Sequence, residues 1–330
     1  AQYGSDAIAG VINLRLREAD HGGGLSVTSG EYVTRLHGFY GRKENVTDGR
    51  TTTVSGWQGL NLLGDGFLTL SAEYRTRDHT NRSDIDPRFG KVTSRFGDAD
   101  VDDLSFYANA GKPLNDTWDA YGWYGYQKRE GSSAATYRTP TDATQNIISV
   151  YPNGYLPLIK TKTEDNSAGI GLKGELGGFK TDVNLVYGKN QIDFNVDHTL
   201  NPSLGPTSPH SFYAGELTYN QLVFGSDFSR EFDVGLVKPL NVAFGLEARK
   251  ETYKIGAGEP GSYIRGPFTT LALGSRGFSG FTPSNVVNKD RNAVGVYLDV
   301  EGNLTEKLSA SAAVRYEDYS DFGNNTTGKI

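Results

Sequence analysis

Charged side chains collect near one end of several strand-like segments, and they are the residues best suited to bind a solute. In the predicted register the following charged residues share one face: Arg75, Arg77, Arg129, Arg249, Glu251, Arg315 and Glu317. Arginine outnumbers glutamate here, and a guanidinium matches the oxygen pairs of carboxylates and phosphates. The set therefore favours an anionic ligand mildly. The competing interpretation is that these charges pair with nearby carboxylates or with one another.

Aromatic side chains lie on both faces of one segment, 117–130. Tyr121 and Trp123 share the face of the charged set and could stack on sugar rings or aromatic chelators. Trp118 and Tyr126 fall on the opposite face, where anchoring at a membrane surface explains them, because amphipathic rings prefer the headgroup level. We therefore group Tyr121 and Trp123 with the candidate ligand-facing residues.

Metal and catalytic signatures are weak. No pair among the five histidines has the spacing of metal ligands, and cysteine is absent: His21, His37, His79, His198 and His210. Acidic segments at 84–90 and 98–103 lack the spacing of a calcium-binding loop. A G-x-G-x-x-G match at 256–261 contains Pro260 and opens no helix, and no G-x-S-x-G motif occurs. The sequence predicts no metal site, no cofactor and no enzyme.

The segments that carry these side chains alternate between apolar and polar residues. Residues 179–187, 240–248 and 308–316 place an apolar side chain at every second position. A period of two is typical of an extended strand with one apolar and one wet face.

Aromatic residues mark the ends of the apolar faces. Phe179 and Tyr187 lie eight positions apart, which at roughly 3.3 Å per residue and a tilt of ~40° spans on the order of 20 Å, close to the ~25 Å apolar band of an outer-membrane barrel. The predicted membrane girdle comprises Tyr74, Trp118, Tyr126, Phe179, Tyr187 and Tyr316.

Composition agrees with such a barrel wall. The 330 residues are 36% hydrophobic with a mean hydropathy of -0.49, and no stretch approaches the ~20 apolar residues of a spanning helix. Half of the side chains of each barrel strand face a polar lumen, so a membrane barrel has no long apolar stretch and this criterion does not detect it. A net charge of -6 argues against a nucleic-acid partner. The chain starts at Ala1, contains no Met and shows no signal peptide, so we expect a piece of a longer protein.

Short turns alternate with long polar loops along the chain, as in outer-membrane barrels. Short turns are expected at 64–66, 113–116, 177–178, 238–241 and 303–307. Long loops are expected near 41–50, 81–100, 131–162, 198–211 and 257–288. Between them we predict about eleven strands: 24–40, 51–63, 67–79, 101–112, 117–130, 164–176, 179–196, 218–237, 240–256, 289–302 and 307–322. Because single-chain bacterial barrels close with an even strand number, further strands are expected beyond this chain.

The opening motif YGSDAIAGVIN resembles the end of the plug domain of TonB-dependent outer-membrane receptors. The matching residues are Tyr3, Gly4, Ser5, Ala7, Gly10, Ile12 and Asn13. The resemblance implies two parts: residues 1–20 as the C-terminal end of a plug, and residues 21–330 as an incomplete barrel. The predicted fold is thus all-β, a partial antiparallel transmembrane β-barrel with about 11 of 22 strands and the edge of a plug.

The resemblance also implies a function and partners. Such receptors lie in the outer membrane of Gram-negative bacteria, contact its lipid, and import metal chelates such as iron-siderophores, cobalamin or oligosaccharides. The TonB–ExbB–ExbD complex supplies the energy through an N-terminal box that this sequence lacks. None of the loop sequences identifies a ligand.

Two other functions fit the strand pattern. One is a passive porin, adhesin or barrel enzyme of the same membrane, and the other is a soluble β-rich module such as a carbohydrate-binding sandwich. The sandwich interpretation requires Leu70, Val183, Phe244 and Val314 to meet in a dry core between two sheets.

Overall fold

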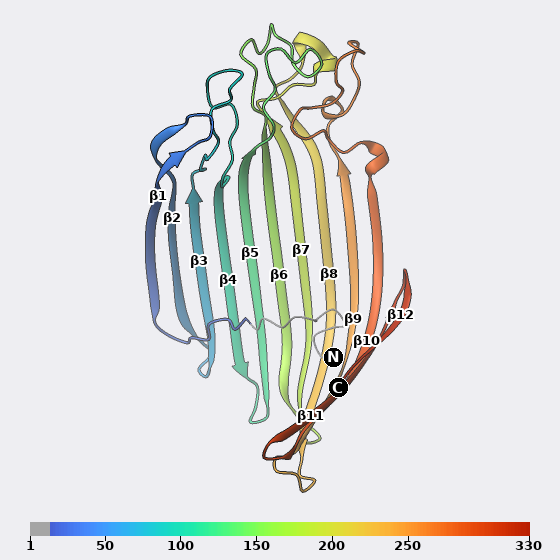
Figure 1. The fold of residues 1–330 in the computed structure, drawn as a ribbon. Coiled ribbons are helices and arrows are strands. Elements are labelled where there is room, and N and C mark those ends of the chain that lie inside the picture. Colours follow the sequence, from blue (N-terminus) through green and yellow to red (C-terminus); the bar gives the residue numbers. More distant parts are fainter. Residues whose placement is uncertain (1–13) are drawn as a thin grey trace.

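The computed structural model describes residues 14–330 and contains one antiparallel sheet of twelve strands paired in chain order (Figure 1). The strands are β1 (Gly23–His37), β2 (Lys43–Leu62), β3 (Gly66–Arg77), β4 (Asp100–Pro113), β5 (Trp118–Ala134), β6 (Leu158–Leu176), β7 (Phe179–Asp197), β8 (Ser211–Phe232), β9 (Leu240–Ala257), β10 (Val287–Thr305), β11 (Leu308–Tyr319) and β12 (Gly323–Lys329). Three short 3₁₀ turns lie in the loops: η1 (Pro202–Thr207), η2 (Pro260–Ser262) and η3 (Pro283–Asn285). The predicted all-β class is confirmed.

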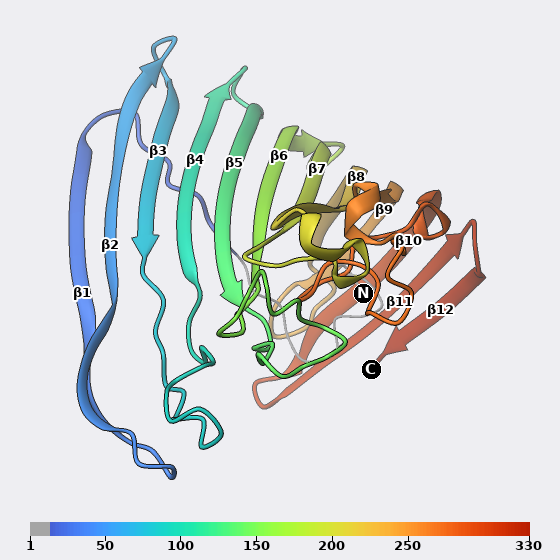
Figure 2. The ribbon, with the colours of Figure 1, turned by 90° about the horizontal axis from the view of Figure 1, so that it is seen from above.

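The sheet is a curved, open wall. Seen from above, it bends into an arc from β1 to β12, with the long loops gathered inside the curve (Figure 2). Short turns lie at the lower end of the strands and long loops at the upper end (Figure 1). We call the inner side of this arc the concave face and the other the outer face.

The outer face is apolar and uncovered. Phe244, Leu298 and Val314 are register partners on three neighbouring strands, and they remain 38%, 44% and 45% exposed. Within residues 14–330 all strands belong to this one sheet, so no second sheet packs on the row. The dry core that a soluble sandwich requires is therefore not present, and an uncovered apolar surface of this extent is typical of a lipid contact.

Glycines on the concave face accommodate aromatic rings from the adjacent strands. A Cβ at Gly125 would lie 2.6 Å from the ring of Tyr107, and a Cβ at Gly245 would lie 2.6 Å from the ring of Tyr297. Since real side chains do not approach so closely, only glycine lets these rings lie flat across the neighbouring strand. The Tyr297 ring thereby reaches a polar partner, Asp227, two strands away.

The segment before β1 crosses the concave face. The backbone N–H of Ala19 donates to Thr69 Oγ1 (2.9 Å), and Asn109 Nδ2 donates to the carbonyl of Arg17 (3.0 Å). The Arg17 guanidinium lies 4.1 Å from the centre of a Trp57 ring. Within residues 14–330 no helix is long and apolar enough to cross a membrane.

Several predicted boundaries are wrong. The loop expected near 41–50 is short, because β2 already begins at Lys43, and the polar stretch after 322 forms β12. Strands β6 and β8 begin at 158 and 211, well before the predicted 164 and 218. In β6 the outer face at this level carries Lys160 and Lys162, so the apolar alternation that signals a strand disappears.

Candidate ligand-binding surfaces

Three long loops form a single packed unit, which we call the loop cap: residues 135–157, 198–210 and 258–286. Asn201 donates its side-chain N–H groups to the carbonyls of Gly261 (2.9 Å) and Ile264 (2.8 Å). Thr199 Oγ1 donates to the carbonyl of Arg276 (2.7 Å). The backbone N–H of Ala272 donates to the carbonyl of Thr144 (2.9 Å) and so ties in the first loop. These bonds join segments that are about 60 or more positions apart in sequence, so the cap is a tertiary structure rather than three independent loops.

Among residues 14–330, the most deeply buried side chains lie in and beneath this cap. Val196, Leu200 and Asn201 have 0% exposure and Phe212 has 1%. The strands, by contrast, form a single sheet layer, so most of their side chains stay partly exposed. Because most buried polar groups of a folded protein are hydrogen-bonded, the density of buried side chain–backbone bonds indicates that the cap is preorganised.

The cap packs over the concave face. Phe194 of β7 stacks on Phe278 of the cap, with ring centres 5.1 Å apart, and Phe281 meets Phe194 edge-on at 6.2 Å. The view from above shows the loops inside the arc (Figure 2). The loop cap therefore covers part of the concave face at the upper end of the strands.

Aromatic and imidazole rings gather at one side of the cap. Tyr151 stacks on Tyr155 with ring centres 4.4 Å apart. Its hydroxyl lies 3.1 Å from His210 Nδ1, and its ring centre lies 5.7 Å from that of His198. Burial raises the pKa of both tyrosines, so their hydroxyls stay protonated. Within residues 14–330, no group of three or more potential ligand side chains could hold a metal ion.

The predicted charged residues of the wall are largely paired. Arg75 Nε donates to Asp103 Oδ2 (2.9 Å), and Arg129 Nε donates to Asp103 Oδ1 (2.5 Å). The three residues are cross-strand partners on β3, β4 and β5. Arg77 instead donates to the carbonyl of Ala99 at 3.3 Å.

A second network runs across β9, β10 and β11. Glu251 accepts from Arg291 Nε at 2.6 Å, and Arg249 Nε lies 3.9 Å from both Glu251 and Glu247. Arg315 Nη2 continues the chain, 3.7 Å from Glu247 and 2.8 Å from Glu317. Three arginines face three glutamates, so this network carries no excess of positive charge. A ligand-binding role of the predicted wall residues stays a prediction.

Tyr121 and Trp123 both lie on the concave face, beside a cavity of about 1080 Å³. The Tyr121 hydroxyl donates to Asp182 Oδ1 (2.7 Å), reaching from β5 across β6 to β7. Arg15 and Asp119 also line this cavity, between the segment before β1 and the wall. The cavity therefore offers one aromatic wall and charges of both signs.

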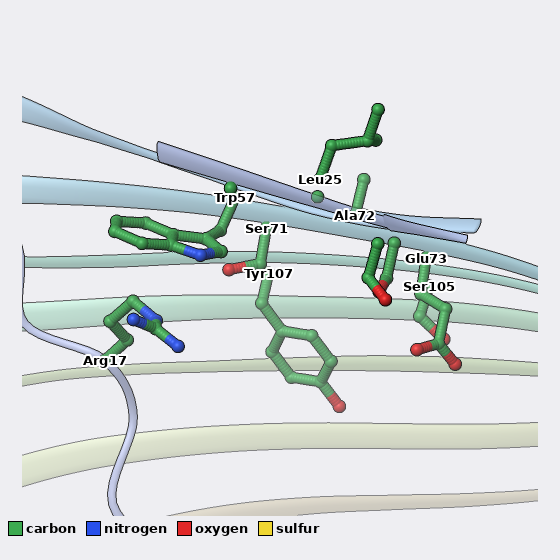
Figure 3. A pocket seen from close by; sticks show the side chains of 12 residues that line it. Arg17, Leu25, Trp57, Ser71, Ala72, Glu73, Ser105 and Tyr107 are labelled. Atoms are coloured by element: carbon green, nitrogen blue, oxygen red, sulfur yellow. The ribbon is translucent and has the colours of Figure 1, made fainter. Parts of the chain in front are cut away.

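A smaller cavity, about 550 Å³, lies near the start of the wall. Trp57, Ser71, Glu73 and Tyr107 line it from one side of the sheet, facing Arg17, whereas Leu25 points to the opposite side (Figure 3). The segment before β1 already occupies the face of Trp57. This arrangement marks a contact between segments rather than an open binding site.

The predicted girdle residues lie on the outer face of the sheet by register. Tyr74, Tyr187 and Tyr316 are 48%, 42% and 43% exposed. Trp118 is half-buried at the lower end of β5, and Phe179 meets Phe244 edge-on at 5.5 Å. Tyr126 is the cross-strand partner of Phe106 on β4. Contact with lipid stays a prediction for all six. The predicted plug signature, Tyr3 to Asn13, lies outside the described residues.

Sequence reasoning missed the acidic partners and the cap. Asp103, Glu247 and Asp182 were not selected, although each lies within hydrogen-bonding or ion-pair range of a predicted residue. These partners could have been predicted from one pattern, in which a carboxylate lies in a predicted strand next to a strand that bears an arginine. For the cap no local signal exists, because its contacts join distant loops.

An open, curved antiparallel wall with an apolar outer face, a polar concave face and long loops at one end defines part of an outer-membrane-type β-barrel. Residues 115–330 match the family model described as TonB dependent receptor-like, beta-barrel. The chain belongs to this family of receptors.

Solved structures agree with the fold. The siderophore receptor PirA from Acinetobacter baumannii superimposes with a TM-score of 0.60 at 14% identity, over 96% of this chain and 41% of that one. A variant of the ferric enterobactin receptor PfeA from Pseudomonas aeruginosa gives 0.64 at 13% identity, over 99% and 43%. The chain thus spans less than half the length of these structures. No curated protein matches the sequence.

Proposed function

We propose that this chain forms part of the wall and the loop cap of a ligand-gated receptor for active import across the outer membrane of a Gram-negative bacterium. The match of residues 115–330 to the receptor barrel family carries this proposal. The uncovered apolar outer face and the polar concave face support it, because a barrel in lipid needs both.

The proposal divides the chain into two parts. Residues 1–20 form the end of a plug, and residues 21–330 form barrel wall whose strand edges, β1 and β12, pair with strands outside this chain. Unpaired edges are not tolerated in the hydrocarbon region, so such pairing is required in a membrane. Outer-membrane lipid contacts the outer face, and the TonB–ExbB–ExbD complex energises transport through a region outside this chain.

The imported ligand is a small molecule such as a metal chelate or an oligosaccharide. Tyr121 and Trp123 offer ring faces for stacking, and Arg77 is the predicted wall arginine that forms no ion pair within residues 14–330. We propose these three as the wall residues most available to a ligand passing through the lumen.

Growth tests in matched hosts examine the proposal. The full-length receptor is expressed in Gram-negative hosts with and without TonB, with ferric siderophores or oligosaccharides as the limiting nutrient. We expect heat-modifiable migration from the outer-membrane fraction and receptor-dependent growth that disappears without TonB. Growth that persists without TonB identifies a passive porin, and a receptor found in the soluble fraction refutes the membrane assignment.

A further inference from the structure

Two arginines from different loops of the cap lie within electrostatic range of each other. The backbone of Arg138 pairs with that of Tyr155 through N–H···O bonds of 2.8 and 2.9 Å. The residue after Arg276, Gly277, packs so closely on the same loop that a Cβ there would lie 2.9 Å from Pro157 and 3.3 Å from Ala135. The side chains of Arg138 and Arg276 therefore belong to one small region around Tyr155.

Neither arginine has an acidic partner within residues 14–330. Every other arginine cluster described above is held by carboxylates, but no carboxylate oxygen lies within 4.0 Å of Arg138 or Arg276 there. Arg138 Nε is buried without a hydrogen-bond partner. Arg276 Nε donates to the carbonyl of Gly274 (3.2 Å) and Arg276 Nη2 donates to the carbonyl of Leu273, and each of these carbonyls carries only a partial charge.

The electrostatics identify this region as cationic and partly dehydrated. Burial, and then the positive charge of Arg138, lower the pKa of Arg276. Asp142 is within electrostatic range of both arginines, but its carboxylate accepts from the backbone N–H groups of Thr144 (3.1 Å) and Gln145 (3.0 Å). Both arginines are half-buried, and the positive charge of one acts on the other. Desolvating a guanidinium without a directly paired counter-charge is costly, so the two together favour a bound anion.

The surroundings would orient such an anion. Tyr155 is 2% exposed, and its hydroxyl is committed to the carbonyl of Gln145 (2.7 Å). The ring is therefore held in place, within electrostatic range of both arginines. Guanidinium groups bind the paired oxygens of carboxylate or phosphate through parallel N–H···O bonds.

We propose that Arg138 and Arg276 form the recognition site of the loop cap for an oxyanion group, a carboxylate or a phosphate, on the imported ligand. This inference rests on the import function proposed above and names the chemical class of its ligand. The cap lies inside the curve of the sheet, on the side away from the outer face that we assign to lipid (Figure 2), so we expect the oxyanion to arrive on a dissolved molecule. The wall arginines other than Arg77, which carboxylates already neutralise, contribute little to this selectivity.

Selenate, a divalent oxyanion that anomalous scattering locates, tests the site in crystals of the full-length receptor. We expect a selenium peak within hydrogen-bond reach of both guanidinium groups, in crystals grown without lipopolysaccharide. A peak that appears only when lipopolysaccharide is present would identify a lipid phosphate as the source and overturn the dissolved ligand. The absence of any peak at this place would overturn the site itself.

Solution measurements distinguish a specific oxyanion site from the binding of an adventitious ion only. The midpoint of thermal unfolding is followed as sulfate replaces chloride at constant ionic strength, since a ligand that binds only the folded state stabilises it. We expect the Arg138→Gln and Arg276→Gln variants to weaken the sulfate response about tenfold. The matched control is Arg265→Gln, an exposed arginine of the same loop as Arg276, which should respond like the unaltered receptor. Equal responses in all variants mean an adventitious ion only and overturn the proposal.

Two further results separate this inference from the import function. The Arg138→Lys variant keeps the charge and should retain part of the sulfate response, whereas loss through misfolding would lower the unfolding midpoint in chloride as well. Sulfate binding by a receptor that imports without TonB would refute the coupling alone. TonB-dependent import of an anionic nutrient that survives in both glutamine variants would refute the oxyanion site alone.

Discussion

Tyr297 and Asp227 are joined across an intervening strand. The Tyr297 hydroxyl on β10 donates to Asp227 Oδ1 on β8 at 2.6 Å, and its ring crosses Gly245 of β9. Tyr121 and Asp182 repeat the arrangement across Gly171 of β6. Each bond spans three strands, so the concave face is stabilised by interactions that the backbone ladder alone does not provide.

The first prediction concerns the glycine under Tyr297. Gly245→Val places a Cβ 2.6 Å from the tyrosine ring and from a backbone carbonyl, and we expect it to lower the free energy of unfolding by about 1–3 kcal/mol. Urea unfolding of the receptor in detergent measures the change. Gly188→Ala is the control, because its Cβ would meet nothing within 4 Å. Equal stability of the two variants would contradict a packed ring at Gly245.

The second prediction concerns the carboxylate between two arginines. Asp103 is buried, and Asp103→Asn removes the charge that Arg75 and Arg129 share. Because both arginines are partly exposed, we expect a loss of about 1–3 kcal/mol rather than the full cost of breaking a buried pair. Asp102→Asn, at the next and exposed position, should change stability by less than about 0.5 kcal/mol. The reverse order in urea unfolding would refute the pairing.

The third prediction concerns the cohesion of the loop cap. Asn201→Ala leaves the buried carbonyls of Gly261 and Ile264 without their donors, at a cost of about 1–3 kcal/mol for unsatisfied groups. We expect faster proteolysis within 258–286 while the strands stay protected. Thr270→Ala, at an exposed position of the same loop, should be cleaved at the original rate. Unchanged cleavage in the Asn201 variant would show that the loops are independent.

The fourth prediction concerns acid. The backbone N–H of Tyr40 and then those of Ile85 and Arg42 lower the pKa of Asp84 below 3.8. Because the folded-state pKa of Asp84 is lowered, the hydrogen bonds that hold residues 38–42 to its carboxylate are fully present above pH 3.8. They weaken as the pH falls through the lowered value. Hydrogen exchange of the Tyr40 and Arg42 amides, corrected for the intrinsic rate, should accelerate only at such low pH. In Asp84→Asn the corrected rate should not depend on pH; an identical acid response in that variant would contradict the assignment.

The sequence identified the parts of the wall where alternation is clean. In β3, β7 and β9, apolar and polar residues alternate along the strand, and the predicted ends lie within about two residues of the observed ones. Where strands extend beyond the apolar band, as at Lys160 and Lys162, both faces are polar and the signal fails. β12 failed for the same reason, since its residues are Gly, Asn, Thr and Lys.

The candidate site was predictable only in part. Arg75, Arg129 and Arg315 could be placed on one face by counting positions, but their partners depend on which strands are neighbours and in which register. Arg138 and Arg276 lie in two loops whose sequences show no periodicity, and they are far apart along the chain. Their meeting results from the docking of distant loops, which no local pattern encodes.

The central claim is that the outer face contacts lipid while the concave face is wet. The three tryptophans test it, because Trp118 lies on the outer face and Trp57 and Trp123 on the concave face by register. Receptors that retain one tryptophan, with all others replaced by Phe, are reconstituted with brominated phospholipids. If the outer face contacts lipid, we expect strong fluorescence quenching of Trp118 and little quenching of Trp123. Equal quenching of the two, or stronger quenching of Trp123, would contradict it.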